Sequence, residues 1–160
     1  MPLVYGYETA ESTVAAATGT ATYTGQGRLS LQMPTTREWR KLDANLSVDF
    51  SNNTIGGSMK ISEAADHTKL TAGTLTLPTT TMSSTRFDAS NAQITINQTI
   101  DTAKNTTTQY ALNTADVSGE VNGGVLDGII KADGAVNTID GSGNTTSVNV
   151  VINGGYIIKD

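Results

Sequence analysis

The chain has 160 residues, a usual size for a single domain with its own core. Only 16% of its residues are charged and 37% are hydrophobic, and Thr, Gly, Ser and Asn make up much of the rest. The net charge of -5 disfavours nucleic acid and anionic membrane surfaces as partners. There is no Cys, and no apolar stretch of signal-peptide or membrane-spanning length follows Met1, which leaves open whether a leader precedes it.

Strict alternation of polar and apolar residues predicts a long strand over residues 19–33. The other face of this strand carries Thr, Gln, Arg and Ser, and β-branched Thr suits a pleated, half-buried surface. Two glycines on the inner face are typical of a strand that bends around a barrel wall. The inner face carries Ala21, Tyr23, Gly25, Gly27, Leu29, Leu31 and Met33.

A hairpin is predicted over residues 42–61, with a turn at Ser51-Asn52-Asn53. Its inward residues are Leu42, Ala44, Leu46, Val48 and Phe50 in the first strand and Ile55, Gly57, Met59 and Ile61 in the second. A register slip of one residue would bury the polar row instead, so this pattern specifies the pairing.

Five further strands are predicted over residues 70–77, 92–100, 109–121, 125–132 and 147–158. Pro78 should end the first of them, and Ile100 should share a face with Ala92, Ile94, Ile96 and Gln98. Eight successive strands predict an all-β fold, a single antiparallel up-and-down β-barrel, with a β-sandwich as the alternative. Helical periodicity is restricted to residues 11–17.

Residues 1–18 differ from the barrel domain, residues 19–160, and are predicted to form an extended N-terminal arm and linker. Leu3, Tyr5 and Tyr7 alternate with less apolar residues, as in a strand. One interpretation is that the arm folds back as a plug or extra edge strand of its own barrel. The other is that it pairs with a neighbouring subunit by strand addition, which makes these three residues candidate partner-binding residues.

Several segments resemble the barrel domain of the transferrin-binding-protein-B-like surface lipoproteins. The segment GTATYTG at residues 19–25 is followed by LDANLSVDFSNNTIGG at residues 42–57. Glycine-spaced segments then follow in the family's order at residues 117–123, 127–128 and 154–156. The resemblance implies an eight-stranded barrel whose relatives bind host proteins or haem through loops and outer surface. The loop usually found in that family is here reduced to residues 124–126, and the lipoprotein leader with its Cys is absent.

The sequence offers little for catalysis, metal or cofactor binding, and we predict neither an enzyme nor a cofactor. His67 is the single histidine, and no nucleophile-elbow sequence accompanies it, so a solvated loop position is expected. Asp140, Ser142 and Asn144 have the spacing of calcium-loop ligands. Thr145 replaces the required Gly and Val151 replaces the bidentate Glu, so this segment is predicted to be a hairpin turn.

Trp39 lies between Glu38 and Arg40, out of phase with the inner face of the second strand. It is a candidate contact residue, although partial burial under the barrel rim is the alternative. We therefore expect a non-enzymatic structural or binding β-barrel on the exterior of a virion, surface array or cell. It would act by protein-protein contact, most simply as a decoration or accessory subunit. An exported protein that binds a host protein or haem, as the resemblance implies, is the alternative.

Overall fold

The computed structural model describes residues 18–63 and 72–160, and this part of the chain is entirely β-structure and loops. No helix in the described part is long and apolar enough to cross a bilayer. The ten strands are β1 (Thr20–Gln32), β2 (Arg37–Asp49), β3 (Thr54–Glu63), β4 (Gly73–Thr81), β5 (Arg86–Ile96), β6 (Thr99–Asp101), β7 (Thr106–Leu112), β8 (Ala115–Asn122), β9 (Val125–Ile139) and β10 (Thr145–Lys159).

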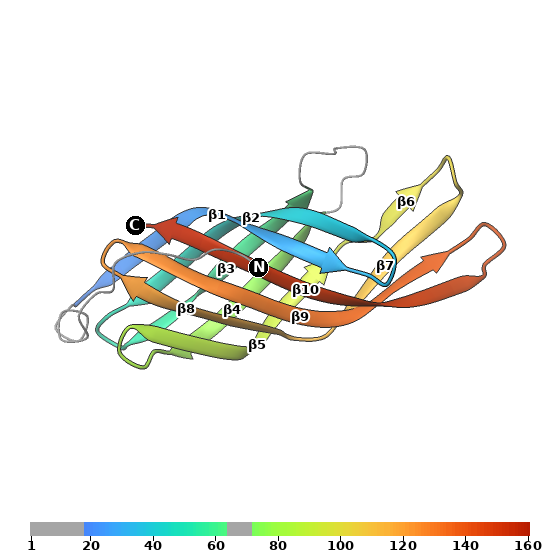
Figure 1. Cartoon of the computed structure of the whole chain (residues 1–160). Helices are drawn as coiled ribbons and strands as arrows, with labels where there is room; N and C mark the ends of the chain where they lie inside the picture. The colour runs from blue at the N-terminus through green and yellow to red at the C-terminus, as the bar shows by residue number, and fades with distance from the viewer. Residues whose placement is uncertain (1–17, 64–71) are drawn as a thin grey trace.

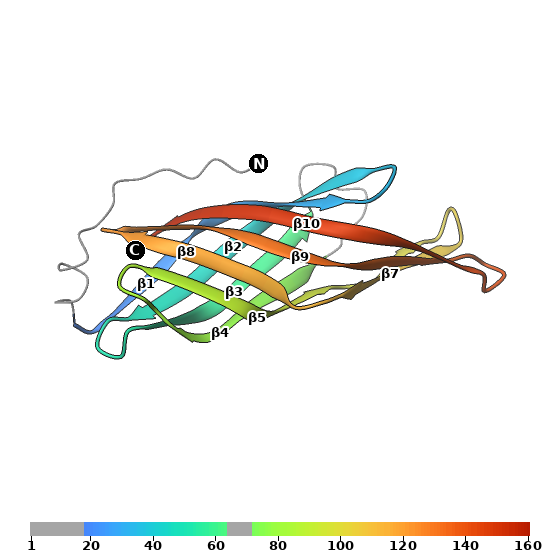
Figure 2. The ribbon, with the colours of Figure 1, turned by 60° about the horizontal axis from the view of Figure 1, so that its bottom comes forward.

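Eight of the strands close into an antiparallel barrel in the order β1, β2, β3, β4, β5, β8, β9 and β10. The barrel closes because β10 pairs with β9 on one side and with β1 on the other, where Thr24 lies opposite Lys159 (Figure 1). The view in Figure 2 shows the wall continuing around the molecule. The predicted antiparallel barrel is confirmed, and the sandwich alternative is wrong, because two packed sheets would not pair back onto each other.

The first hairpin is formed by β2 and β3, and its predicted inside and outside are confirmed except at Phe50 and at Gly57, which is exposed. Leu46 and Val48 are buried, whereas Asn45 and Ser47 between them are exposed. Phe50 is only half-buried, because β2 ends one residue earlier and Phe50 opens the turn. The backbone N–H of Phe50 donates to the carbonyl of Gly19 at 2.9 Å, which pairs the turn with the start of β1.

Two strand ends differ from the prediction in the middle of the chain. β4 continues past Pro78 to Thr81, because Pro78 sits at a bulge where the register shifts between Ile55 and Gly57 of β3. A proline at a bulge removes no ladder hydrogen bond. The predicted strand over residues 92–100 is also wrong in its bounds: β5 starts at Arg86 and ends at Ile96.

The predicted single strand over residues 109–121 is two strands, β7 and β8, separated at Asn113 and Thr114. Asn113 holds this branch point, since its N–H and its Nδ2 donate to the carbonyl and the Oδ1 of Asp133 at 2.9 and 2.8 Å. At this point β9 exchanges its neighbour, pairing with β8 over Val125–Lys131 and with β7 over Gly134–Ile139. The first half of the long strand β9 thus belongs to the barrel, and its second half continues beyond the barrel wall.

Beyond the barrel, four strand segments form a projecting sheet that we call the extension (Figure 1). It consists of β6, β7, the second half of β9 and the first half of β10, which are residues 99–101, 106–112, 134–139 and 145–150. One row across all four strands is made of threonines: Thr99, Thr108, Thr138 and Thr146 lie opposite one another in turn. β-branched residues are favoured in such cross-strand rows.

Inside the barrel, one aromatic side chain explains two glycines of the C-terminal strands, Gly119 and Gly128. Tyr156 is 1% exposed, lies opposite Gly128, and donates its hydroxyl to the carbonyl of Ser118 at 2.9 Å. A Cβ on Gly119 would lie 2.6 Å from that hydroxyl and 2.7 Å from Cε1 of Phe87. Both glycines are therefore required because ring atoms occupy the space of a side chain.

Candidate protein-contact surface

Trp39 lies on the outer wall, within β2, which begins at Arg37 and so earlier than predicted. Its position out of phase with the inner face is confirmed, and the residue is 45% exposed. The guanidinium carbon of Arg28, on the neighbouring strand β1, lies 5.8 Å from the centre of the indole ring. The indole is thus an aromatic side chain held beside a cation and open to solvent on the outer wall.

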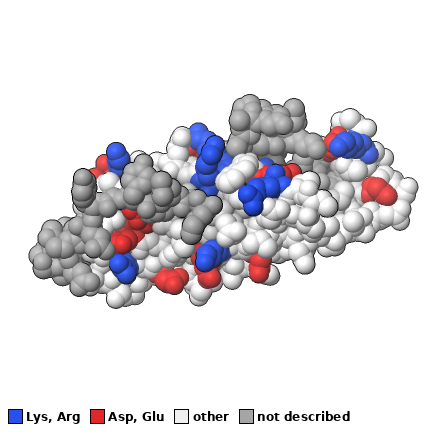
Figure 3. Space-filling view, in the orientation of Figure 1, with Lys and Arg blue, Asp and Glu red and all other residues white. Residues whose placement is uncertain are grey.

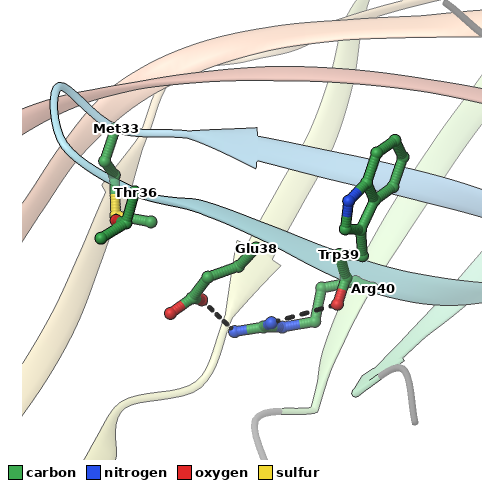
Figure 4. A network of polar contacts seen from close by, with 5 residues as sticks. All are labelled: Met33, Thr36, Glu38, Trp39 and Arg40. Atoms are coloured by element: carbon green, nitrogen blue, oxygen red, sulfur yellow. Dashed lines mark hydrogen bonds and ion pairs between the residues drawn. The ribbon is translucent and has the colours of Figure 1, made fainter. Parts of the chain in front are cut away.

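Glu38 and Arg40 point to the opposite side of β2 from Trp39, as Figure 4 shows. Arg40 is 4% exposed, and its Nη2 donates to Oε2 of Glu38 at 2.7 Å. Its Nη1 donates to the backbone carbonyl of Trp39 at 3.3 Å. Since a buried guanidinium fixes that carbonyl, the backbone that carries the indole is held in place from the inside.

The turn between β1 and β2, next to Trp39, is closed by local hydrogen bonds. The N–H of Met33 donates to the carbonyl of Thr36 at 2.9 Å, and the Thr36 hydroxyl reaches the Met33 sulfur at 3.8 Å (Figure 4). Arg37 Nε donates to Oε1 of Gln32 at 2.6 Å across the base of the turn. These contacts order the turn at the end of the β1–β2 hairpin that carries Trp39.

The extension exposes large apolar residues that the sequence analysis did not single out. Ile100 is 63% exposed and Val148 is 36% exposed, and Val151, just beyond the extension in β10, is 49% exposed. The prediction that Ile100 shares a strand face with Ile94 and Ile96 is wrong, because the chain leaves β5 at Asn97 and Ile100 belongs to β6. Gln98 on the otherwise apolar face was the signal of this break.

The outer wall carries few charges for its size, as the large uncoloured areas of Figure 3 show. Two pairs of opposite charge lie on this wall: Arg86 Nε lies 3.4 Å from Glu120 Oε1, and Lys41 Nζ lies 3.9 Å from Asp43 Oδ1. Pairs this exposed contribute little to stability. A partner would therefore meet mainly hydroxyl, amide and scattered apolar groups.

A groove of about 610 Å³ runs along the outside of β5, β8 and β9. The pKa of Asp127 in this groove is raised, and burial of its carboxyl group is the main cause. The hydrogen bond from Asn122 opposes this effect, and the Glu120 carboxylate opposite adds to it. Asn122 Nδ2 donates to Asp127 Oδ2 at 3.2 Å. In the described part of the chain, no group of three or more His, Cys, Asp and Glu side chains is arranged to hold a metal ion.

Asp140 closes the turn between β9 and β10, so the predicted hairpin turn is confirmed. Its Oδ1 accepts the N–H groups of Ser142 and Asn144, each at 2.9 Å. These hydrogen bonds, with the Asn144 backbone bond the largest cause, hold the pKa of Asp140 below its usual value. The carboxylate that could have begun a calcium loop is engaged by its own turn.

Trp39 is the one predicted contact residue that falls within the described part of the chain. Leu3, Tyr5 and Tyr7 of the arm, the possible helix over residues 11–17, and His67 all lie outside the described residues. The described residues define a closed eight-stranded antiparallel β-barrel with a projecting extension. A scan of protein-family models finds none that matches the chain, and a search of curated proteins finds no significant match.

Proposed function

We propose that the protein is a non-enzymatic β-barrel displayed on the exterior of a particle or cell. It acts as a decoration or accessory subunit through protein-protein contact, with a virion or surface array as the preferred setting. The single observation that carries this proposal is that the closed barrel is filled by its own side chains. Leu42, Leu46 and Ile130, from three different strands, each have 0% exposure. A partner must therefore bind to the outer wall, the rim or the extension.

The outer wall supports the proposal at Trp39. Exposed tryptophans on ordered backbone are common hot spots, because they bury a large apolar area with few rotatable bonds. The contacts of Arg28 and Arg40 supply that order. We propose Trp39 as a partner-binding residue.

The arm supplies the other proposed contacts. Leu3, Tyr5 and Tyr7 form an apolar stripe in the sequence. The described strands close the barrel by themselves, through the pairing of β1 with β10. Burying three such side chains contributes several kcal/mol at about 25 cal/mol per Å², before the cost of ordering the arm. We propose that the arm packs on a neighbouring subunit or shell protein.

The test first identifies the particle or envelope fraction with which the protein sediments in its native source. It then measures how strongly three variants associate with that fraction. Deleting residues 1–10 and Trp39→Ala should each weaken association by tenfold or more, which is about 1.4 kcal/mol. Asn45→Ala, also exposed on the outside of β2, is the matched control. The melting temperature should stay unchanged in all three. Association that survives both changes, or that falls only in proportion to lost stability, contradicts the proposal.

The alternative proposal is an exported surface protein, similar to the transferrin-binding-protein-B-like barrels, that binds a host protein or haem. One observation favours it. The glycine-spaced segments that carry the resemblance meet in space, since Ser118, Gly119 and Gly128 surround the hydroxyl of Tyr156. These residues stabilise the barrel, so they support a common fold rather than a ligand. Titration with free haem, followed by its absorbance, separates the two functions, because the preferred proposal predicts no saturable shift.

A further inference from the structure

The first half of β10 in the extension is an open sheet edge. Thr145 to Val150 pair with Ile139 to Gly134 of β9, whereas β1 pairs with β10 only from Val151 onward. Within the described ranges, no other strand pairs with this segment. Residues 145–149 are all exposed. The segment is thus a strand with one satisfied side and one side open to solvent.

The hydrogen-bond pattern identifies which backbone groups face this open side. The Asp140 N–H donates to the Asn144 carbonyl at 2.9 Å, so the alternate pairs that follow along the hairpin also exchange hydrogen bonds. Val148 therefore bonds to β9, whereas the odd-numbered residues do not. The hydrogen bond from the Phe50 N–H to the Gly19 carbonyl leads to the same result. It implies that the odd-numbered residues of β1 bond to β2 and the even-numbered ones to β10. The odd-numbered residues of β10 therefore point toward β1, and the even-numbered ones toward β9. The N–H and C=O groups of Thr145, Ser147 and Asn149 point to the open edge.

This edge lacks the devices that usually prevent strand pairing. Natural edge strands carry charges, prolines or bulges that block a second chain. The segment TTSVNV at residues 145–150 has none of these, and its pairing with β9 is continuous. It is also rich in β-branched residues, with Val148 exposed on it and Val151 exposed just beyond it. The edge is suited to accept another uncharged strand.

We propose that two copies of the chain pair antiparallel through this edge of β10, about a two-fold axis at Ser147. This inference goes beyond the proposed function and does not depend on it. A register centred on Ser147 places Thr145 opposite Asn149 of the second copy and Ser147 opposite its own equivalent. All three open residues then form hydrogen-bonded pairs, which gives roughly six hydrogen bonds.

The side chains of this register are compatible with one another. Thr146 lies opposite Val148 of the second copy on one face, and no charged residue faces another. A register shifted by one residue toward Val148 would require Val151, whose backbone already pairs with β1. A second copy is the occupant we infer because the segment is complementary to itself. Six residues on each side are fewer than in a stable dimer interface, so the dimer should be weak and concentration-dependent.

The test uses the self-facing position. Ser147→Lys and Ser147→Glu each place like charges opposite one another, and each should raise the dimer dissociation constant at least tenfold. An equimolar mixture of the two variants should restore association as a heterodimer. Ser147→Pro removes only the N–H that points to the open edge, and it should also weaken the dimer. Ser58→Lys, at an exposed position of β3 with neighbours on both sides, is the matched control and should leave the dimer intact.

Sedimentation velocity of the full chain, from about 1 to 500 µM, measures these effects. Unchanged melting temperatures show that the exposed substitutions leave the fold intact. The proposal is overturned if the unmodified chain stays monomeric throughout this range, if the Lys and Glu variants dimerise as it does, or if their mixture fails to associate. Dimerisation that is lost on deletion of residues 1–10 and unaffected by Ser147→Lys would also overturn it, because the arm would then be the contact. A failure of the particle-binding test of the proposed function would not affect the dimer proposal, because sedimentation velocity measures self-association alone.

Discussion

Gly119→Ala tests whether Tyr156 determines the packing of the C-terminal strands. The added Cβ would lie 2.6 Å from the Tyr156 hydroxyl, 2.7 Å from the Asp127 carbonyl and 2.7 Å from Cε1 of Phe87. A Cβ atom does not approach other atoms this closely, so the Tyr156 ring or the backbone of β9 must move. The Tyr156 hydroxyl would then lose its 2.9 Å hydrogen bond to Ser118.

Three contributions set the size of the effect. Overpacking a core costs about 1–3 kcal/mol. Losing the hydrogen bond adds about 0.5–1.5 kcal/mol, while replacing Gly with Ala in an ordinary backbone conformation returns about 0.4–1 kcal/mol through the unfolded state. The net loss of unfolding free energy should be about 0.5–4 kcal/mol. For a chain of this size the melting temperature should fall by roughly 1–16 °C.

Gly56→Ala is the matched control, because Gly56 also lies in a strand. A Cβ added at Gly56 would come no closer than 3.4 Å to any atom, a distance that it reaches at the Leu77 carbonyl oxygen. Urea unfolding of both variants and the unmodified protein measures the difference. Gly56→Ala should be neutral or slightly stabilising. If Gly119→Ala unfolds within about 0.5 kcal/mol of Gly56→Ala, the account of Tyr156 as the reason for this glycine is wrong.

Three other predictions follow from the same structure. In urea unfolding, Leu46→Ala should lower the free energy of unfolding by about 2–5 kcal/mol, whereas Ser47→Ala should change it by less than about 0.5 kcal/mol. Phe50→Ala should cost less than the roughly 3–5 kcal/mol that is typical of a fully buried Phe. Equal costs for all three variants would contradict the register. Burial raises the pKa of Tyr156, with Asp127 adding to the effect, so its contribution to stability is complete below the unfolded-state pKa of about 10 and is lost as the pH rises above it. Thermal melts of Tyr156→Phe should show a shallower alkaline fall than those of the unmodified protein, and parallel curves would refute this. The pKa of Asp140 is lowered, so its contribution is present above the unfolded-state pKa of about 3.9 and is lost as the pH falls through the folded-state value. An NMR titration of its carboxyl carbon should give a midpoint below 3.9, and a midpoint at or above that value would contradict the turn geometry.

The site was less predictable than the fold. The phase of Trp39 could be read from its neighbours in β2, because side chains alternate along a strand. That Arg28 flanks the indole, and that Arg40 fixes its backbone from inside, depends on pairing between strands. The open edge of β10 was not foreseen, since it exists only where β1 ends and β9 continues.

Alternation along the chain was enough to predict the all-β class, the long first strand, and most of the inside and outside of the β2–β3 hairpin, because alternation is a local property of consecutive residues. Pairing between distant strands closes the barrel, divides the segment over residues 109–121 into β7 and β8, and leaves Ile100 facing solvent. The same packing explains why Gly119 and Gly128 are glycines, since Tyr156 from β10 occupies the space of their side chains. These features depend on which distant strand lies alongside, and a pattern of period two is the same whether its neighbour is a barrel wall, an extension or water.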